Sequence, residues 1–183
     1  YRETQEWGNN LVDFEDWLTV LMLKFALLKC LPDLTKERFK IRSGLQGGQM
    51  RFTGKSVVIT GATGGLGRAT AQRFYDEGAN IVLVDLHQND IDAFLQTFDT
   101  DSKRIIGIEA DVSKDADVKN YVNETMAVFG RIDTLFNNAG IEGSISSLEN
   151  YEEEIFDRVV QVNIKGVWLG MRYCADAMRQ SGG

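Results

Sequence analysis

From residue 55 onward, the sequence alternates between short apolar runs and longer stretches whose apolar residues recur at helical spacing. The short runs are rich in β-branched residues and end in small or polar ones, which is typical of strands buried on both faces. They cover residues 56–60, 80–85, 104–111 and 132–140. The longer stretches predict helices over residues 67–79, 89–98 and 113–130. This alternation predicts an α/β fold with a doubly wound parallel sheet of the Rossmann type.

The helix expected over 113–130 carries the clearest start and stop signals. Ser113 is a suitable N-cap, and Gly130 stands where the helix can end. A longer helical stretch over 151–179 is the last element that the pattern predicts. The sheet would then stop after its fourth strand and the next helix, which would leave an apolar edge exposed. We therefore expect the natural protein to continue beyond Gly183.

Residues 1–49 differ in their sequence pattern from the rest of the chain. The small-residue stretch 43–50 separates the two parts and is the best candidate for a linker. We expect a helical extension of unknown role over 1–49 and a nucleotide-binding domain over 50–183. Because Met50 would be a natural first residue for that domain, the extension is either the tail of a fused domain or upstream sequence that the domain does not need.

The apolar run Trp17–Leu31 is the one segment that raises the question of a membrane. It is shorter than the roughly 20 residues that span a bilayer, and Lys24 and Lys29 interrupt it. Acidic residues also precede it where a signal peptide would have a basic region. We interpret it as a buried helix and expect no membrane partner.

The charge of the chain narrows the class of partner. Its net charge is -7, and residues 1–49 hold seven basic and seven acidic residues, so the acidic excess lies in 50–183. An acidic domain does not attract nucleic acid through its overall field, so no nucleic-acid partner is expected. Cys30 and Cys174 have no metal-ligand spacing and indicate buried or free thiols in a reducing compartment, which we expect to be the cytoplasm. His87 is the single histidine. We therefore expect no metal site.

The stretch "VVITGATGGLG", residues 57–67, places a glycine-rich turn directly after the first strand. A side chain at Gly61 would prevent the tight turn, Gly65 would let a pyrophosphate approach the backbone, and Gly67 would let the next helix pack closely. That helix, expected to begin near Leu66, would point its unpaired amides at the phosphates. The alternative is a strand-to-helix turn without a ligand. A P-loop is excluded because no Gly-Lys-Ser/Thr follows the turn.

Asp85 ends the second strand, where dinucleotide-binding folds place the acid that binds the adenosine ribose. Its carboxylate can accept both ribose hydroxyls, whereas a 2′-phosphate would meet a like charge. Leu86 follows the acid instead of an arginine. We therefore expect NAD over NADP, with Arg68 and His87 as the nearest residues that could alter this preference. An ordinary aspartate at the end of a strand is the alternative.

The sequences "TGATGGLG", "VD", "ADV" and "FNNAG" occur in this order, and with them the region 50–183 resembles the short-chain dehydrogenase/reductase (SDR) family. The resemblance covers about the first half of such a domain. The segments "FNNAGIEG" and "FDRVVQVNIKGVWLGMRY" look most like members that oxidise secondary or cyclic alcohols with NAD, of the levodione reductase and cyclohexanol dehydrogenase type. The resemblance implies an oxidoreductase that acts on an alcohol or ketone and forms a homodimer or homotetramer, with Trp168 and Met171 in the helix interface.

The resemblance also assigns roles to residues near the cofactor. Asp111 would accept a hydrogen bond from the adenine amine beside Val112, although it could instead cap the helix that follows. Asn137 and Asn138 would brace the central strands. The cofactor-binding set is Gly61, Thr63, Gly64, Gly65, Leu66, Gly67, Asp85, Leu86, Asp111, Val112, Asn138, Ala139 and Gly140.

Asn163 matches the family's catalytic asparagine, which bends the long helix and holds a water in a proton relay. Asparagine is a poor helix former, so a local irregularity is expected there; a helix-interior polar residue of no consequence is the alternative. The family's catalytic serine and Tyr-x-x-x-Lys pair have no counterpart in the 183 residues. Two interpretations stay open: the first part of an NAD-dependent alcohol dehydrogenase, inactive alone, or a non-catalytic dinucleotide-binding or interaction module.

Overall fold

Four strands form one parallel sheet in the computed structural model, which describes residues 50–99 and 102–182. The strands lie in the order β3-β2-β1-β4, so the first strand in sequence is central. Their bounds are Ser56–Thr60 for β1, Asn80–Asp85 for β2, Ile105–Glu109 for β3 and Thr134–Phe136 for β4. In the β1–β2 register Val57 lies beside Ile81, and in the β1–β4 register it lies beside Thr134. The predicted α/β class with a parallel sheet is confirmed.

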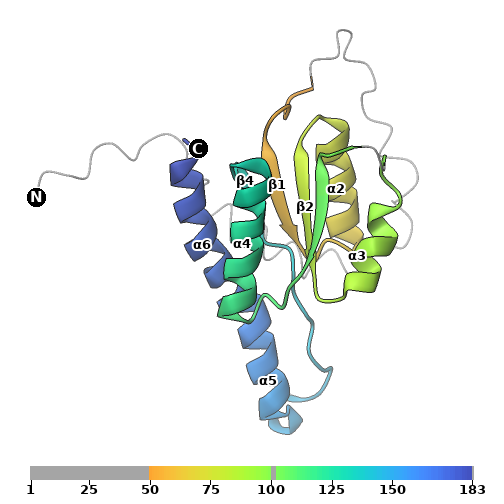
Figure 1. The fold of residues 1–183 in the computed structure, drawn as a ribbon. Helices are drawn as coiled ribbons and strands as arrows, with labels where there is room; N and C mark the ends of the chain where they lie inside the picture. Colours follow the sequence, from red (N-terminus) through yellow and green to blue (C-terminus); the bar gives the residue numbers. More distant parts are fainter. Residues whose placement is uncertain (1–49, 100–101, 183) are drawn as a thin grey trace, which may run out of the picture. The chain divides into compact units, whose positions relative to one another are not determined.

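Helices cover both faces of this sheet (Figure 1). The helices α2 and α3 share one core with alternate residues of the central strands, and α4 and α6 share the other. In β1, for example, Val57 and Ile59 face the first pair of helices while Val58 faces the second. The sheet is therefore doubly wound, as the alternating pattern predicts. The helices are α2 Gly65–Asp76, α3 Gln88–Leu95, α4 Asp115–Phe129 and α6 Val167–Gln180.

The central strand β2 explains why its sequence is apolar without alternation. Ile81, Val82, Leu83 and Val84 are all fully buried, because neighbouring strands and helices cover both of their faces. Burying an aliphatic side chain of this size stabilises a fold by about 1.5–3 kcal/mol. The strand therefore holds its carboxyl-terminal residue, Asp85, on a rigid base.

The strand β4, Thr134–Phe136, is shorter than the predicted strand 132–140. Asn138 and Ala139 donate their backbone amides to the Thr60 hydroxyl, each at 3.0 Å, instead of continuing the strand pairing. The predicted strand 104–111 was also too long, since β3 ends at Glu109. In both places the chain leaves the sheet where a polar side chain offers its backbone another partner.

The start of α4 corrects the prediction that Ser113 is its N-cap. The helix begins at Asp115, and Lys114 occupies the cap position without a side-chain cap hydrogen bond. Ser113 instead donates its backbone amide and its hydroxyl to Asp111 Oδ1, at 3.0 and 2.6 Å. The predicted end is confirmed, because Gly130 closes the helix with a left-handed φ of 70°.

The long helix predicted over 151–179 is divided into segments. A short 3₁₀ turn η1, Leu148–Asn150, precedes α5, Glu153–Val160, and a π-helical turn η2, Gln161–Gly166, joins α5 to α6. The irregularity expected at Asn163 is therefore present. A Cβ at Gly166 would lie 2.9 Å from Val112 Cγ2, so this turn packs closely against the β3–α4 connection.

Within the described residues, no helix is long and apolar enough to cross a membrane. The helical extension expected over 1–49, with the apolar run Trp17–Leu31 and Cys30, lies outside the described residues.

Candidate functional site

The glycine turn between β1 and α2 is shaped by backbone packing. Gly61 has a φ of 62°, and a Cβ there would lie 2.9 Å from the Cα of Ala139. A Cβ at Gly67 would lie 2.2 Å from the Gly61 carbonyl oxygen and 2.7 Å from the Cα of Ala62. Both positions exclude side chains, as the sequence pattern predicts. The helix packs against the turn itself, and this closeness fixes the direction in which α2 begins.

The first residues of α2 face outward with their backbone accessible. Gly64 occupies the N-cap without a side-chain hydrogen bond, and the first turn contains no acidic residue. Gly64, Gly65 and Leu66 are exposed, and a Cβ at Gly65 would meet no atom within 4 Å. The amides at the start of a helix carry partial positive charge and need acceptors. This open backbone surface is therefore suited to a phosphate group.

Asp85 is joined to the turn by its side chain. Its Oδ2 accepts hydrogen bonds from the backbone amide of Thr63 at 2.8 Å and from the Thr63 hydroxyl at 2.7 Å. Its Oδ1 accepts the Leu86 amide at 2.8 Å. A carboxylate has about four lone-pair positions, so roughly one stays available on Oδ1. The end of β2 and the glycine turn thus form one hydrogen-bonded unit.

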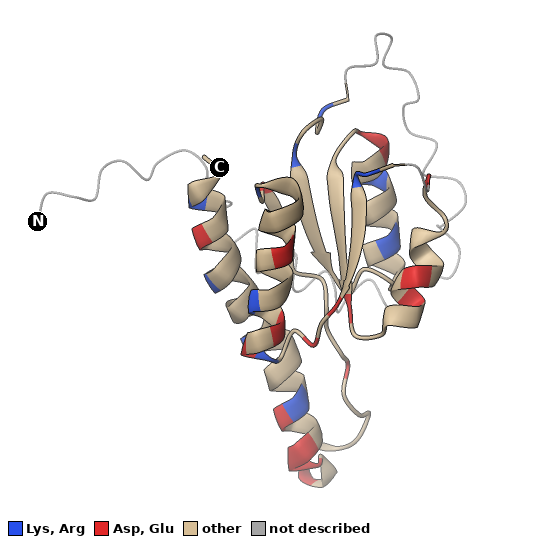
Figure 2. Cartoon of the chain, in the orientation of Figure 1, with Lys and Arg blue, Asp and Glu red and all other residues tan. Residues whose placement is uncertain are grey.

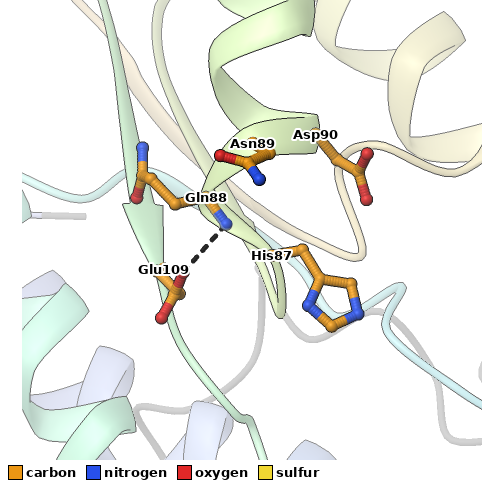
Figure 3. Close-up of a pocket in the computed structure, with 5 residues that line it drawn as sticks. All are labelled: His87, Gln88, Asn89, Asp90 and Glu109. Atoms are coloured by element: carbon orange, nitrogen blue, oxygen red, sulfur yellow. Dashed lines mark hydrogen bonds between the residues drawn. The ribbon is translucent and has the colours of Figure 1, made fainter.

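Arg68 and His87, the two residues that could alter the cofactor preference, have different surroundings. Arg68 Nε donates to the Thr63 carbonyl at 2.6 Å, and its guanidinium carbon lies 4.4 Å from the centroid of the Phe94 ring. His87 lies outside this unit, in a shallow hollow (Figure 3). The other residues that line the hollow are Gln88, Asn89, Asp90 and Glu109.

The segment after β3 holds Asp111 in a turn. Besides the two bonds from Ser113, its backbone amide donates to Asp117 Oδ2 at 3.0 Å, and Lys114 Nζ lies 3.4 Å from its Oδ2. Burial acts to raise the pKa of Asp111, but the hydrogen bonds from Ser113 and Lys114 outweigh it and lower the pKa. Asp111 therefore stays ionised as an acceptor. It supports the turn before α4, not the helix end itself.

The two asparagines after β4 brace different elements. Asn138 Nδ2 donates to the carbonyl oxygens of Thr60 and Gly61, at 3.0 and 2.9 Å, which confirms that it joins the central strands. Asn137 Nδ2 instead donates to the Val167 carbonyl at 3.2 Å, at the start of α6. The expectation that Asn137 braces the strands is therefore wrong, because its side chain reaches the helix layer.

Both polar atoms of the Asn163 side chain form hydrogen bonds with the backbone of Ile141. Its Oδ1 accepts the Ile141 amide at 2.9 Å, and its Nδ2 donates to the Ile141 carbonyl at 2.8 Å. The π-helical turn is thereby tied to the chain just after Gly140. By the capacity of an amide, one lone pair and one hydrogen of Asn163 are left for a water or another group.

Cys174, on α6, is buried in the core that α6 shares with α4. Its side chain is 1% exposed, and burial raises the pKa of the thiol to about 12. The thiol therefore stays protonated near neutral pH and is a poor nucleophile. Burial likewise raises the pKa of the neighbouring Tyr121 hydroxyl, so neither group serves acid-base chemistry near neutral pH.

Two residues outside the predicted cofactor-binding set are central to the geometry. The Thr60 hydroxyl accepts the two backbone amides that end β4, and Arg68 holds the carbonyl of Thr63. Thr60 offered a signal, because it is a polar residue at the end of an apolar strand. Arg68 offered none beyond its nearness to the turn.

Acidic positions gather at the carboxyl edge of the sheet, at the ends of β2 and β3 (Figure 2). They include Asp85, Glu109 and Asp111. Side chains of this charge repel phosphates. A phosphate-bearing ligand at this edge therefore depends on backbone amides such as those at the start of α2.

Comparison with known proteins identifies related sequences and structures. A model of the short chain dehydrogenase family matches residues 55–183. Levodione reductase of Leifsonia aquatica is 43% identical over 136 residues, which are 72% of this chain and 50% of that enzyme. A solved structure of levodione reductase matches over 73% of this chain and 52% of that chain, with 43% identity and a TM-score of 0.68.

Two further solved structures were crystallised with a dinucleotide. The 3-ketoacyl-(acyl-carrier-protein) reductase from Brucella melitensis, complexed with NADH, is 36% identical, with a TM-score of 0.67 over 71% of this chain and 52% of that chain. An SDR from Burkholderia phymatum in complex with NAD is 33% identical, with a TM-score of 0.68 over 72% and 47% of the two chains. The chain spans about half the length of the curated relatives it matches.

The family assignment rests on agreement between sequence and structure. The matched residues 55–183 contain the whole described sheet with its helices, and the related structures share this fold. The predicted resemblance to levodione reductase-type alcohol dehydrogenases is confirmed at the level of similarity. The chain belongs to the short-chain dehydrogenase/reductase family.

Proposed function

We propose that the chain binds NAD at the carboxyl edge of its sheet, and that the protein moves a hydride between NAD and an alcohol or ketone. The observation that carries this proposal is the turn Gly61–Gly67, which presents open backbone amides beside an acid held by the same turn. The dinucleotides in the related crystal structures support the same class of cofactor.

The residues of the turn fit a pyrophosphate. The start of α2 offers amides without a side-chain cap, and no atom would contact a Cβ at Gly65, so a phosphate has room to approach. In this proposal the backbone of the turn binds the pyrophosphate, and Thr63 holds its amide and hydroxyl toward the acid. The residues assigned to the pyrophosphate are Gly61, Gly64, Gly65, Leu66 and Gly67, and Thr63 belongs to the cofactor site by holding the acid.

The remaining site residues would bind the two nucleoside ends. Asp85 and Leu86 contact the adenosine ribose, and Asp111 and Val112 lie beside the adenine. Asn138, Ala139 and Gly140 follow β4, where small residues let the nicotinamide ribose pass close to the backbone. The close approach of Ala139 to Gly61 supports this placement, because it brings the two segments to one edge.

The preference for NAD over NADP follows from the charge of Asp85. Its side chain is half-buried, and Oδ1 retains room for a ribose hydroxyl. A 2′-phosphate in the same place would add like charge in a partly desolvated site. The guanidinium of Arg68 is held on Thr63 and Phe94.

In this proposal, turnover needs a proton donor that the 183 residues do not supply. The nicotinamide, when bound, accepts or supplies the hydride. No tyrosine in the sequence is followed four positions later by a lysine, and Tyr121 and Cys174 hold their protons near neutral pH. We therefore propose that this chain alone does not oxidise alcohols. Asn163 would act in the whole domain by holding the chain after β4 and a water beside it.

The proposed oligomer uses α6. Trp168 is 50% exposed and Met171 is 44% exposed, so this helix presents apolar side chains outward. Apolar exposure of this kind suits a homodimer or homotetramer interface. A location in the cytoplasm completes the proposal, in keeping with the free thiol of Cys174.

The test is calorimetric titration of the chain with ADP-ribose and with its 2′-phosphorylated form, followed by NADH. We expect ADP-ribose to bind, the 2′-phosphorylated form to bind more weakly, and NADH to gain little because the nicotinamide end has few contacts. Asp85→Asn keeps the shape and removes the charge, and we expect it to reduce the preference by about tenfold. No binding of ADP-ribose would overturn the proposal.

The alternative is a dinucleotide-binding or interaction module without catalysis. An alcohol oxidation assay of the natural protein, as its source organism produces it, separates the two. Binding without any turnover of secondary or cyclic alcohols, in the presence of NAD, would favour the module.

A further inference from the structure

Thr63 is held from two sides within the glycine turn. Its amide and hydroxyl both donate to Asp85 Oδ2, while its carbonyl accepts Arg68 Nε at 2.6 Å. Every polar group of this residue therefore has a partner within the protein. The carboxylate that faces the ribose and the guanidinium of α2 are joined through one residue.

Arg68 is itself fixed by packing. Its guanidinium carbon lies 4.4 Å from the centroid of the Phe94 ring, and Phe94 is 4% exposed in the core between the sheet and α3. A guanidinium over an aromatic face is attracted to the ring. The side chain is thus directed into the protein, with Nε aimed at the turn.

We propose that Arg68 is a positioning residue for cofactor selection, which acts on Asp85 through Thr63 and does not bind a 2′-phosphate. This inference rests on the proposed dinucleotide function. With the Thr63 carbonyl held by Arg68, its amide and hydroxyl stay directed at Asp85 Oδ2, and Oδ1 stays directed at the ribose. Without that restraint the carboxylate can rotate, which weakens the ribose contact and relieves the repulsion of a 2′-phosphate.

The two possible roles of Arg68 predict effects of opposite sign. If Arg68 positions Asp85, its loss weakens ADP-ribose binding. The preference for ADP-ribose over its 2′-phosphorylated form then becomes smaller. If Arg68 binds a 2′-phosphate, its loss weakens binding of the 2′-phosphorylated form. The preference for ADP-ribose then becomes larger. A role in folding alone would weaken both ligands equally.

The experiment compares Arg68→Gln with Arg68→Met in the full chain. Glutamine places an amide nitrogen at the same number of bonds from the backbone as the arginine Nε, so it can donate to Thr63 without charge. Methionine has similar length and no donor. Both variants lose the guanidinium over the Phe94 ring, so the loss of the cation–π contact is common to both.

Binding of ADP-ribose and of its 2′-phosphorylated form is measured by calorimetry, with the urea midpoint as the folding control. We expect Arg68→Met to weaken ADP-ribose binding by about threefold to tenfold, the loss of one hydrogen bond, and to narrow the preference by a similar factor. Arg68→Gln should stay within about twofold of the parent protein.

A double variant shows whether Arg68 acts through Asp85. In an Asp85→Asn background, Arg68→Met should leave the preference unchanged, because the charge that it positions is gone. Equal behaviour of the glutamine and methionine variants, or a wider preference in either, would overturn the inference while the dinucleotide function stands. If the parent chain binds neither ligand, the proposed function itself fails.

Discussion

The glycine turn at residues 61–67 and the segment 141–150 both follow a strand of the same sheet, yet the protein restrains them very differently. In the turn, Gly67 touches backbone, and Thr63 has partners for all its polar groups. In the segment, Ile145 is 102% exposed and Leu148 is 92% exposed.

The segment is anchored at a few points. Ile141 bonds to Asn163, and the Ser144 amide donates to the Tyr151 hydroxyl at 3.3 Å. The comparison shows that conformation is fixed where backbone atoms are in contact, and that the segment depends on individual side-chain bonds. Mutations at the closely packed positions of the turn should therefore cost stability, and mutations in the segment should have local effects.

The largest effect is expected from Gly67→Ala. The added methyl would lie 2.2 Å from the Gly61 carbonyl oxygen, which belongs to a packed backbone, so the turn must deform. We expect a loss of about 3 kcal/mol in the free energy of unfolding, measured by urea denaturation.

Gly65→Ala is the matched control, since its methyl would meet no atom within 4 Å. Its stability should be unchanged or rise by up to about 1 kcal/mol, while ADP-ribose binding weakens because the methyl occupies the proposed phosphate position. Equal destabilisation by the two alanines would show that the turn is not restrained by backbone contact.

The second-largest effect is expected when the pH is lowered, and it concerns Asp133, which is bonded to the amino end of β1. Asp133 accepts the Ser56 amide at 2.9 Å, Lys55 Nζ at 3.0 Å and Arg131 Nε at 2.7 Å. Burial acts to raise the pKa of Asp133, but these hydrogen bonds outweigh it and lower the pKa from 3.8 to about 2. Because the folded-state pKa is depressed, the stabilisation is complete above pH 4 and is lost as the pH falls through about 2.

The loss amounts to about 2 kcal/mol, and urea denaturation between pH 5 and pH 2 measures it. Asp133→Asn should remove this pH dependence. In the segment, hydrogen bonds from its own backbone amide and from Ser147 lower the pKa of Glu149, but its side chain is exposed. Glu149→Gln should therefore leave the acid dependence unchanged, and a comparable change there would break the comparison.

The third effect is expected from Asn163→Ala, which removes both hydrogen bonds to Ile141. Since Ile141 is partly exposed, water replaces the lost partners in part, and we expect a loss of about 1 kcal/mol. Faster hydrogen exchange of the Ile141 amide is the local measurement. Ile164→Ala, on the same π-helical turn and 64% exposed, serves as the control and should leave that amide protected.

The smallest effect is expected in the middle of the segment. Ile145→Ser and Leu148→Ser should change the free energy of unfolding by less than about 0.5 kcal/mol, since both side chains are exposed and lose no packing. Thermal denaturation of each variant tests this. A loss above about 1 kcal/mol would mean that another surface covers these residues in solution.

Local sequence patterns were sufficient for the fold class and for the glycine turn. The strands β1 and β2 were predicted with their observed bounds, because β-branched runs and the turn glycines act over a few residues. Predictions failed where a distant partner decided the outcome. Ser113 looked like an N-cap but bonds to Asp111, and the strand ending at Gly140 was too long because Thr60 takes two of its amides.

The sequence by itself determined the doubly wound parallel sheet, the left-handed Gly61 and Gly130, and the break in the helix at Asn163. These features follow from periodicity and from the conformational limits of single residues, which neighbours in the chain already express. The tertiary structure decided the partners of polar side chains, including the link from Arg68 through Thr63 to Asp85. Such bonds join residues from different elements, and their directions exist only after the elements have packed.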